Sequence, residues 1–271
     1  MKDKFDILDK IIVITGGLGQ LGLQYAAELL ERNARIAIFD LPESAELNRN
    51  QFDLLENSKR FLYCQVNVTD KNSIESGLNK VIKEWGIPHG LINNAALDSP
   101  PHAPISENGP FETYPESSWD KIMEVNAKGV LLMCQVIGGA MAEAKRGSIV
   151  NISSIYGIVS PDHRIYNYRR KTGETFYKPI AYSASKSTIL NMTRYMATYW
   201  APKGVRVNTI TLGGVYNNQE DEFIKEYSSK VPLGRMADPD EYNGAIVFLI
   251  SDASSYMTGS NLIIDGGWTA W

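Results

Sequence analysis

A tyrosine and a lysine stand four residues apart in the run Tyr182-Ser183-Ala184-Ser185-Lys186, a spacing that places both side chains on one face of a helix. A phenol with a pKa near ~10 is a poor acid–base catalyst at neutral pH, but a neighbouring ammonium favours the phenolate and lowers that pKa. The pair is therefore suited to moving a proton to or from a substrate oxygen. Solvent-facing helices carry the same spacing by chance, so on its own it leaves both interpretations open.

A second chemical feature is the pair of hydroxyls at Ser153 and Ser154, which end the apolar run 148–152. The carboxyl end of a strand is where open α/β sheets bind their ligands, and a hydroxyl there can bond a substrate carbonyl or alcohol. Small polar residues also end strands simply because they form turns. The serines therefore indicate a catalytic role only in combination with Tyr182 and Lys186.

The sequence TGGLGQLG at residues 15–22 lies between an apolar run and a helical pattern, and Gly17, Gly19 and Gly22 match G-x-G-x-x-G. Such glycines let the backbone approach a pyrophosphate at a helix N-terminus. Asp40 ends the next apolar run, 23 residues after Gly17, close to the ~20 expected for an acid that binds the ribose hydroxyls. The loop contains no Lys or Arg for a 2′-phosphate, so NAD is favoured over NADP.

Alternating strands and helices position these groups. Short apolar runs predict seven strands near 11–14, 36–39, 61–66, 90–93, 148–152, 205–210 and 262–264, with amphipathic segments between them. This pattern predicts a single α/β domain over 1–271, a doubly wound Rossmann fold whose mostly parallel sheet has helices on both faces. Segments 99–115 and 160–178 read as irregular, 216–230 as a lid, and Asp238-Pro239 as a helix N-cap followed by proline.

Composition excludes several classes of protein. The formal charge of −4 and the pI near 5.5 argue against nucleic acid or an anionic membrane as the main partner. Cys64 and Cys134 lie in apolar runs and read as buried thiols of a reducing compartment. We expect no signal peptide, no stretch approaching ~20 apolar residues and a cytoplasmic location. No metal is expected, because the histidines show no ligand spacing: His89, His102 and His163.

Taken together, the motifs resemble those of the classical short-chain dehydrogenase/reductase family, from about Leu8 to Trp268. The resemblance implies a Rossmann fold, NAD, a small-molecule substrate and a homo-oligomer, either a tetramer or a dimer. It is carried by six features in order: the 15–22 loop, Asn93-Asn94-Ala95-Ala96, Asn126, Asn151-Ile152-Ser153-Ser154, Tyr182 to Lys186, and Thr258-Gly259 with Asp265-Gly266-Gly267.

The resemblance also implies a role for each matching residue. Tyr182 is the general acid/base, Lys186 lowers its pKa and bonds the nicotinamide ribose, Ser154 orients the reacting oxygen and Asn126 holds a proton-relay water. Val215 meets the carboxamide, while Asn93 and Ala95 contact the ribose through side chain or backbone. The complete predicted cofactor set is Gly16, Gly19, Gln20, Leu21, Gly22, Asp40, Asn67, Val68, Asn93, Ala95, Tyr182, Lys186 and Val215.

Three positions depart from the family pattern. Gln20 replaces the central glycine of the usual loop, giving a spacing that resembles the extended branch of the family. Leu212 stands where a proline is usual, and Asn217 where a threonine is usual. These changes bear on the pyrophosphate and nicotinamide contacts and leave the predicted fold intact.

The largest departure is an insertion, because Tyr182 lies 28 positions after Ser154, where the family spacing is a little over a dozen. Segment 160–178 carries a net charge of +3 and lies between two residues of the expected active site. We therefore predict that it borders the substrate pocket, where Arg169 and Arg170 with Ser154 and Tyr182 meet a polyhydroxylated or anionic substrate. The alternative is an oligomer contact or a solvated loop.

The leading functional hypothesis is hydride transfer between NAD(H) and a secondary alcohol or ketone on a polar, sugar-like or phosphorylated substrate. The sequence is also reminiscent of oxidoreductases in bacterial surface-sugar and flagellin-modification pathways. One alternative is an epimerase or dehydratase that returns the hydride. Another is an NAD-binding sensor or scaffold without turnover, which would have no use for Ser154, Tyr182 and Lys186.

Overall fold

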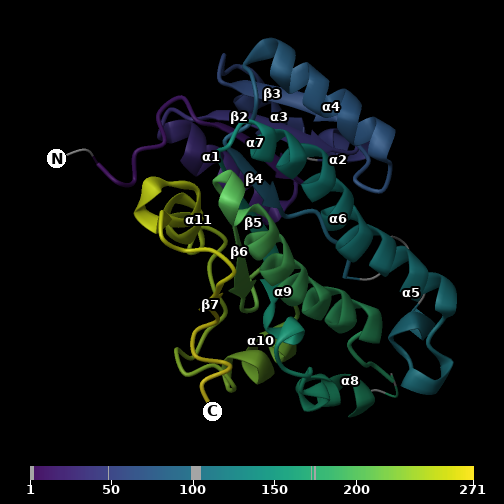
Figure 1. The fold of residues 1–271 in the computed structure, drawn as a ribbon. Helices are drawn as coiled ribbons and strands as arrows, with labels where there is room; N and C mark the ends of the chain where they lie inside the picture. The colour runs from purple at the N-terminus through teal and green to yellow at the C-terminus, as the bar shows by residue number, and fades with distance from the viewer. Residues whose placement is uncertain (1–2, 48, 99–104, 172, 174) are drawn as a thin grey trace.

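The computed structural model describes residues 3–47, 49–98, 105–171, 173 and 175–271. In this part of the chain seven strands form one sheet in the order β3-β2-β1-β4-β5-β6-β7, and each strand pairing is parallel. The predicted doubly wound Rossmann fold is confirmed, with a wholly parallel sheet (Figure 1). The strands are β1 Ile11–Thr15, β2 Arg35–Asp40, β3 Phe61–Gln65, β4 Gly90–Asn93, β5 Gly147–Ser154, β6 Val205–Leu212 and β7 Asn261–Ile264.

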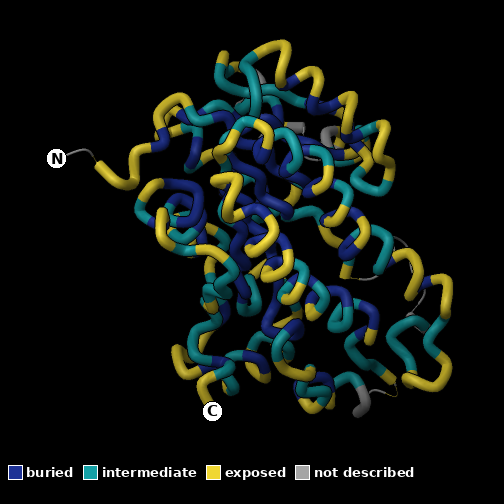
Figure 2. Tube along the Cα trace, in the orientation of Figure 1, coloured by how far each residue is buried: buried dark blue, intermediate teal, exposed yellow. Residues whose placement is uncertain are grey.

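Successive residues of each strand point to opposite faces of the sheet, so an apolar strand feeds two cores. In β1, Ile11 and Val13 join the core under α4, α6, α7 and α9, whereas Ile12 and Ile14 join the core under α1, α3 and α11. Figure 2 shows the buried strands between these two layers. The helices are α1 Gln20–Glu31, α2 Pro42–Leu47, α3 Arg49–Glu56, α4 Lys71–Glu84, α5 Glu116–Met123, α6 Val130–Met133, α7 Gly139–Glu143, α8 Asn167–Lys171, α9 Ile180–Trp200, α10 Asp221–Ser228 and α11 Asn243–Ile250.

The strand order reverses between β1 and β4, which leaves a crevice at the carboxyl ends of these strands. Thr15 ties the two ends together, because its Oγ1 accepts hydrogen bonds from the backbone N–H groups of Asn94 and Ala95, each at 3.0 Å. This crevice is where the glycine-rich loop lies.

One long helical run covers the sheet from Glu116 to Glu143 and comprises α5, α6 and α7 joined by two wider, π-helical turns, Glu124–Gly129 and Cys134–Gly138. By length and hydropathy this run could cross a membrane, a property the sequence analysis did not anticipate. However, 56% of its most apolar stretch is buried within the protein. It is a core helix.

Three predictions of local structure, two for loops and one for a helix start, differ from the structure. Segment 160–178 is not irregular, since it contains a 3₁₀ turn at His163–Tyr166 and helix α8. Segment 99–115, in its described part, contains the 3₁₀ turns Ile105–Asn108 and Phe111–Thr113. Asp238 does not cap a helix; its N–H donates to Glu241 Oε2 at 2.8 Å, which closes a turn, and α11 begins only at Asn243.

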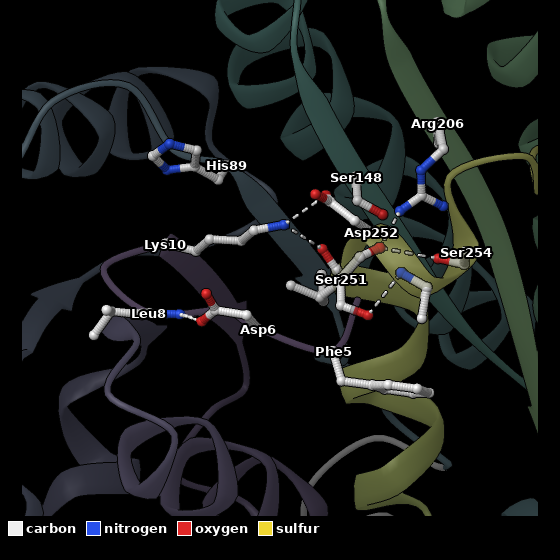
Figure 3. A network of polar contacts seen from close by, with 12 residues as sticks. Phe5, Asp6, Leu8, Lys10, His89, Ser148, Arg206, Ser251, Asp252 and Ser254 are labelled. Atoms are coloured by element: carbon white, nitrogen blue, oxygen red, sulfur yellow. Dashed lines mark hydrogen bonds and ion pairs between the residues drawn. The ribbon is translucent and has the colours of Figure 1, made fainter. Parts of the chain in front are cut away.

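A polar network lies at the opposite end of the sheet, where the strands begin (Figure 3). It connects the starts of β1 and β6 to the segment that follows α11. Lys10 Nζ lies 3.3 Å from both the carbonyl oxygen of Ile250 and Asp252 Oδ1. Arg206 donates to the carbonyl oxygens of Leu249, Ser251 and Met257. The network fixes the end of α11 against β6.

His89 lies beside this network, and its Nδ1 accepts the N–H of Ile11 at 3.1 Å. Burial, with the charges of Arg146 and Lys10, lowers the pKa of His89 from 6.5 to about 4. Between these values the unfolded chain binds the additional proton, so folding stability is present above pH 6.5 and is lost as pH falls towards 4.

We therefore expect His89→Gln to lose less stability than the wild type when pH falls from ~7.5 to ~5. Glutamine retains an acceptor for Ile11 but does not titrate. Thermal unfolding followed by circular dichroism at both pH values measures the difference. An identical loss of Tm in the two proteins would contradict a depressed pKa for His89.

Candidate active site

The glycine-rich loop between β1 and α1 contains glycines of two kinds. A Cβ at Gly22 would lie 2.4 Å from the carbonyl oxygen of Gly16, and one at Gly17 would lie 2.7 Å from Ile38 Cγ1. These two glycines therefore permit close packing of the loop. Gly16, with φ of +59°, lines a cavity but is also closely packed, because its Cβ would lie 2.8 Å from Ala95 Cα. Gly19 lines the same cavity, and its Cβ would meet nothing closer than 3.4 Å.

That cavity, of about 470 Å³, extends from the glycine loop to the ends of β2 and β3. Asp40 forms part of its wall, and its Oδ2 accepts the N–H of Leu18 at 2.9 Å while its Oδ1 accepts that of Leu41 at 2.8 Å. Asp40 thus braces the loop, and each carboxylate oxygen keeps a further lone pair for a ligand. The predicted cofactor residues that line this cavity are Gly16, Gly19, Gln20, Leu21, Asp40, Asn67, Val68 and Ala95.

Asn93 was predicted to contact the ribose, but it does not line this cavity in the described structure. Its Nδ2 donates to Asn151 Oδ1 at 2.8 Å within the buried interior between β4 and β5. The neighbour Asn94, which the predictions omitted, lines the cavity and donates to the carbonyl oxygens of Thr15 and Gly16. The position relative to the strand explains the difference. Asn93 is the last residue of β4 and its side chain is buried between β4 and β5, whereas Asn94 lies beyond the strand, at the cavity.

A second cavity, of about 300 Å³, brings together the predicted catalytic residues Ser154, Tyr182 and Lys186 with Val215. Ser154 ends β5, while Tyr182 and Lys186 lie one turn apart on α9. The hydroxyl of Ser154 is hydrogen-bonded to the phenol of Tyr182. Lys186 Nζ lies 5.8 Å from the centre of the Tyr182 ring and donates to the carbonyl oxygen of Ile152 at 3.0 Å.

Burial dominates the ionisation of this pair. It raises the pKa of the Tyr182 phenol well above its usual value, helped by the charge of Asp98 and opposed by the Ser154 hydrogen bond. Burial also lowers the pKa of Lys186 to about 8, against the charge of Asp98. Tyr182 is thus a neutral phenol at pH 7 unless further positive charge arrives.

Asn126 lies on the π-helical turn Glu124–Gly129 and is buried. Its Oδ1 accepts the N–H of Leu97 at 2.7 Å, and its Nδ2 donates to the carbonyl oxygen of Leu97 at 2.8 Å. Nδ2 also lies 3.0 Å from Ser185 Oγ on α9. The amide therefore fixes the segment after β4 against the helix that carries Tyr182.

Comparison with known proteins decides the family. A sequence model for the family described as Enoyl-(Acyl carrier protein) reductase matches residues 19–269. The chain belongs to the classical short-chain dehydrogenase/reductase family. It is 34% identical to an NAD-dependent glycerol dehydrogenase of Listeria innocua, over 98% of this chain and 96% of that one. It is 31% identical to a D-threitol dehydrogenase of Mycolicibacterium smegmatis, over 98% and 95% of the two chains.

Among solved structures, a short-chain dehydrogenase from Leptospira borgpetersenii with bound NAD⁺ superposes with a TM-score of 0.84. That protein is 34% identical to this chain, and the match covers 99% of this chain and 96% of the other. The similarity in sequence and in fold thus extends over nearly the whole of this short-chain dehydrogenase/reductase.

An aromatic cluster covers the catalytic cavity of this short-chain dehydrogenase/reductase. Tyr227 of α10 stacks on Trp268, with ring centres 4.5 Å apart, and its hydroxyl accepts the N–H of Gly214 at 2.5 Å. The predicted lid segment 216–230 therefore also positions the Gly213-Gly214 turn after β6.

The 160–178 insertion contacts this lid. Glu220 accepts hydrogen bonds from Tyr168 Oη at 2.7 Å and from Arg169 Nη2 at 2.8 Å, and the Arg169 guanidinium lies 4.7 Å from the Phe176 ring centre. Arg169 does not line the described catalytic cavity. The side chain of Arg170 lies outside the described residues, so the predicted substrate contacts of both arginines stay predictions.

Gln20, the unusual residue of the glycine loop, has a definite partner. Its Nε2 donates to the carbonyl oxygen of Tyr216 at 2.7 Å, so the amide connects the loop to the segment after β6. A glycine at this position would lack that link.

Lys178, the last residue of the 160–178 segment that was predicted to border the substrate pocket, was not among the individual residues predicted to contact the substrate. It lines the catalytic cavity, and its Nζ lies 5.0 Å from the centre of the Tyr182 ring. Its place next to Pro179, just before the tyrosine helix, was the available signal. Among the residues described, no group of three possible metal ligands comes together.

Proposed function

We propose that this protein is an NAD-dependent dehydrogenase that oxidises a secondary alcohol group of a small polyol. The observation that carries the proposal is a shared wall: Leu21, Asn94 and Ala96 line both the Asp40 cavity and the Tyr182 cavity. A dinucleotide lying along this wall reaches from the ribose-binding acid at one end to the catalytic phenol at the other.

The glycine loop fits a dinucleotide. Gly19 presents backbone without a Cβ to the cavity, and the first turn of α1 contains no acidic residue to repel a pyrophosphate. The first N–H groups of a helix have no partner within it and attract anions. Asp40 would then accept the adenosine ribose hydroxyls, with Asn67, Val68 and Ala95 around the adenosine.

In the proposed mechanism, bound NAD supplies a hydride acceptor at its nicotinamide. With the positive charge of bound NAD⁺ added to that of Lys186, Tyr182 would be held as the phenolate and would accept the proton of the substrate hydroxyl, while Ser154 would hold the same oxygen by a second hydrogen bond. Lys186 bonds the nicotinamide ribose and, as an ammonium, favours the phenolate of Tyr182. Asn126 holds Leu97 and Ser185 in place and so supports the helix that carries Tyr182 and Lys186. The proton-relay water that the family resemblance implies for Asn126 stays a prediction.

A neutral substrate agrees with the charges near the cavity. In the described part of the chain, the basic side chains of the 160–178 insertion that line or approach the cavity form ion pairs with acidic side chains. Paired charges attract an anion weakly, so a phosphate or carboxylate group is not favoured as the part of the substrate that this insertion binds. The two relatives named above are polyol dehydrogenases. The ion pairs are Arg164–Asp162, Arg169–Glu220 and Lys178–Asp98.

A substrate screen tests the proposal. Purified protein with NAD is offered glycerol, threitol, arabinitol and xylitol, and NADH is followed by its absorbance. We expect NADH formation with at least one polyol and its reversal by the corresponding ketose. Product formed without net NADH would instead indicate an epimerase or dehydratase, and NAD binding without any turnover would indicate a sensor.

We further propose a cytoplasmic homo-oligomer, a dimer or tetramer. Tyr195 and Tyr199 on α9 are 69% and 59% exposed and stack on each other at 6.2 Å, and Leu131 on α6 is 43% exposed. Apolar side chains gathered on long helices favour burial against another copy. Sedimentation velocity measures the assembly directly.

The two kinds of glycine predict different defects. Gly22→Ala forces a Cβ against backbone, so we expect Tm to fall by on the order of 5 °C. Gly19→Ala meets nothing closer than 3.4 Å, so its Tm should stay within about 2 °C while its added methyl group weakens NAD binding about tenfold. Calorimetry and NAD titration separate the two effects, and equal effects in both variants would contradict this assignment.

A further inference from the structure

Lys178 is held beside the catalytic tyrosine by the backbone before α9. Pro179 precedes the helix in an extended conformation, so Lys178 lies outside it and turns back over the ring of Tyr182. Its Nζ is 5.0 Å from that ring centre and 6.0 Å from the centre of the Tyr156 ring, and only 15% of the side chain is exposed. The ammonium is thus largely desolvated at the edge of the catalytic cavity.

Asp98 is the partner of this ammonium, with Nζ to Oδ2 at 2.5 Å. The carboxylate follows Leu97, whose N–H and carbonyl groups are both bonded to Asn126. Lys178 thus lies on the wall of the cavity, whereas Asp98 does not line the described cavity and reaches Lys178 from the segment after β4. Asp98 is 58% exposed and retains acceptor capacity on its carboxylate.

The other polar groups of the described cavity wall already have partners. Gln219 donates to the carbonyl oxygen of Val215 and accepts the N–H of Asn217, and the hydroxyl of Tyr227 accepts the N–H of Gly214. The hydroxyls of Tyr156 and Tyr166 are hydrogen-bonded to each other. An ammonium has three N–H donors, and Asp98 uses one of those of Lys178.

The pair suits a hydroxyl better than an anion. A hydroxyl both donates and accepts a hydrogen bond, which matches a carboxylate beside an ammonium. The pair is neutral as a whole, so it gives no net attraction to a phosphate. Lys178 and Tyr156 also line a larger cavity of about 720 Å³, which gives the rest of a longer polyol room beyond them.

We propose that Lys178 and Asp98 together bind the substrate hydroxyl next to the carbon that is oxidised. This inference rests on the proposed function and narrows its substrate to a vicinal diol. Ser154 and Tyr182 bind the reacting oxygen. Lys178 donates a hydrogen bond to the neighbouring hydroxyl oxygen, and Asp98 accepts a hydrogen bond from that hydroxyl.

The test compares butane-2,3-diol with butan-2-ol, which differ by one hydroxyl beside the reacting carbon. In Lys178→Met we expect the ratio of kcat/KM for the diol over the mono-alcohol to fall at least about tenfold, mainly through KM of the diol. Asp98→Asn should lower the same ratio, and Lys178→Arg should restore part of it. Lys83→Met, an exposed lysine on α4, is the matched control.

Three outcomes decide the matter. An unchanged ratio in both Lys178→Met and Asp98→Asn overturns the inference while the dehydrogenase proposal stands. An equal loss of kcat for both alcohols with a shifted pH profile would show that Lys178 acts through Tyr182, and also overturns it. A wild-type protein that oxidises no alcohol with NAD refutes the proposed function itself. NAD binding and circular dichroism of each variant verify the fold.

Discussion

Tyr182→Phe is expected to reduce kcat by about 100-fold or more while NAD affinity and stability stay close to those of the wild type. The substitution retains the ring that packs against Lys178 and removes only the hydroxyl that is bonded to Ser154. Without that hydroxyl no proton leaves the alcohol as the hydride departs. Steady-state NADH formation and NAD titration measure the two quantities.

Tyr156→Phe is the matched control, because Tyr156 lines the same cavity and its hydroxyl bonds Tyr166. We expect this variant to lose less than about tenfold in kcat. Comparable losses in the two variants would mean that cavity packing matters more than proton transfer. Activity of Tyr182→Phe within a few-fold of the wild type would remove Tyr182 from the mechanism.

A preference for NAD over NADP of at least about tenfold in kcat/KM, and up to about 100-fold, is the second large effect that we expect. Hydrogen bonds to a charged carboxylate contribute ~1.5–3 kcal/mol each, and each ~1.4 kcal/mol corresponds to tenfold. A 2′-phosphate in the same place would meet the negative charge of Asp40, which lines the cavity at the end of β2.

Asp40→Asn and Asp40→Ala separate two roles of this residue. Asparagine can still accept the N–H of Leu18 and keep the loop braced, but it no longer repels a phosphate. Both variants should lower kcat/KM for NAD and reduce the ratio of kcat/KM for NAD over NADP. The fall in Tm should be larger for Asp40→Ala than for Asp40→Asn. Equal wild-type kcat/KM values for the two cofactors would show that Asp40 does not meet the ribose.

The fold was predictable because its strands are buried on both faces and therefore read as continuous apolar runs. β1 was expected at 11–14 and spans Ile11–Thr15, and β2 was expected at 36–39 and spans Arg35–Asp40. Local propensity favours a helix start at Asp238-Pro239, but α11 begins only at Asn243. The ion pair between Arg235 and Glu241, at 2.6 Å, belongs to a turn instead. No single-sequence pattern encodes such a contact.

The site was predictable where a motif fixes geometry, as for Ser154, Tyr182 and Lys186, which the structure brings to one cavity. The contacts of a side chain that could pair with several groups far away in the sequence were not predictable. Arg169 seemed suited to a substrate, but its guanidinium is bonded to Glu220, 51 residues further along the chain. Lys178 was expected only as one basic residue of the 160–178 insertion, because its relation to Tyr182 arises from the backbone turn at Pro179.

The π-helical turn that carries Asn126 makes the length of this helix as important as its composition. Wide turns of this kind contain one residue more than the regular helix would, and they occur frequently at functional sites. Losing a single residue from Glu124–Gly129 would rotate one part of the helix against the other by about 100°. The Asn126 amide would then leave Leu97, although every remaining side chain would be unchanged. For this enzyme, a one-codon deletion in that turn would disable the site more thoroughly than most substitutions around it.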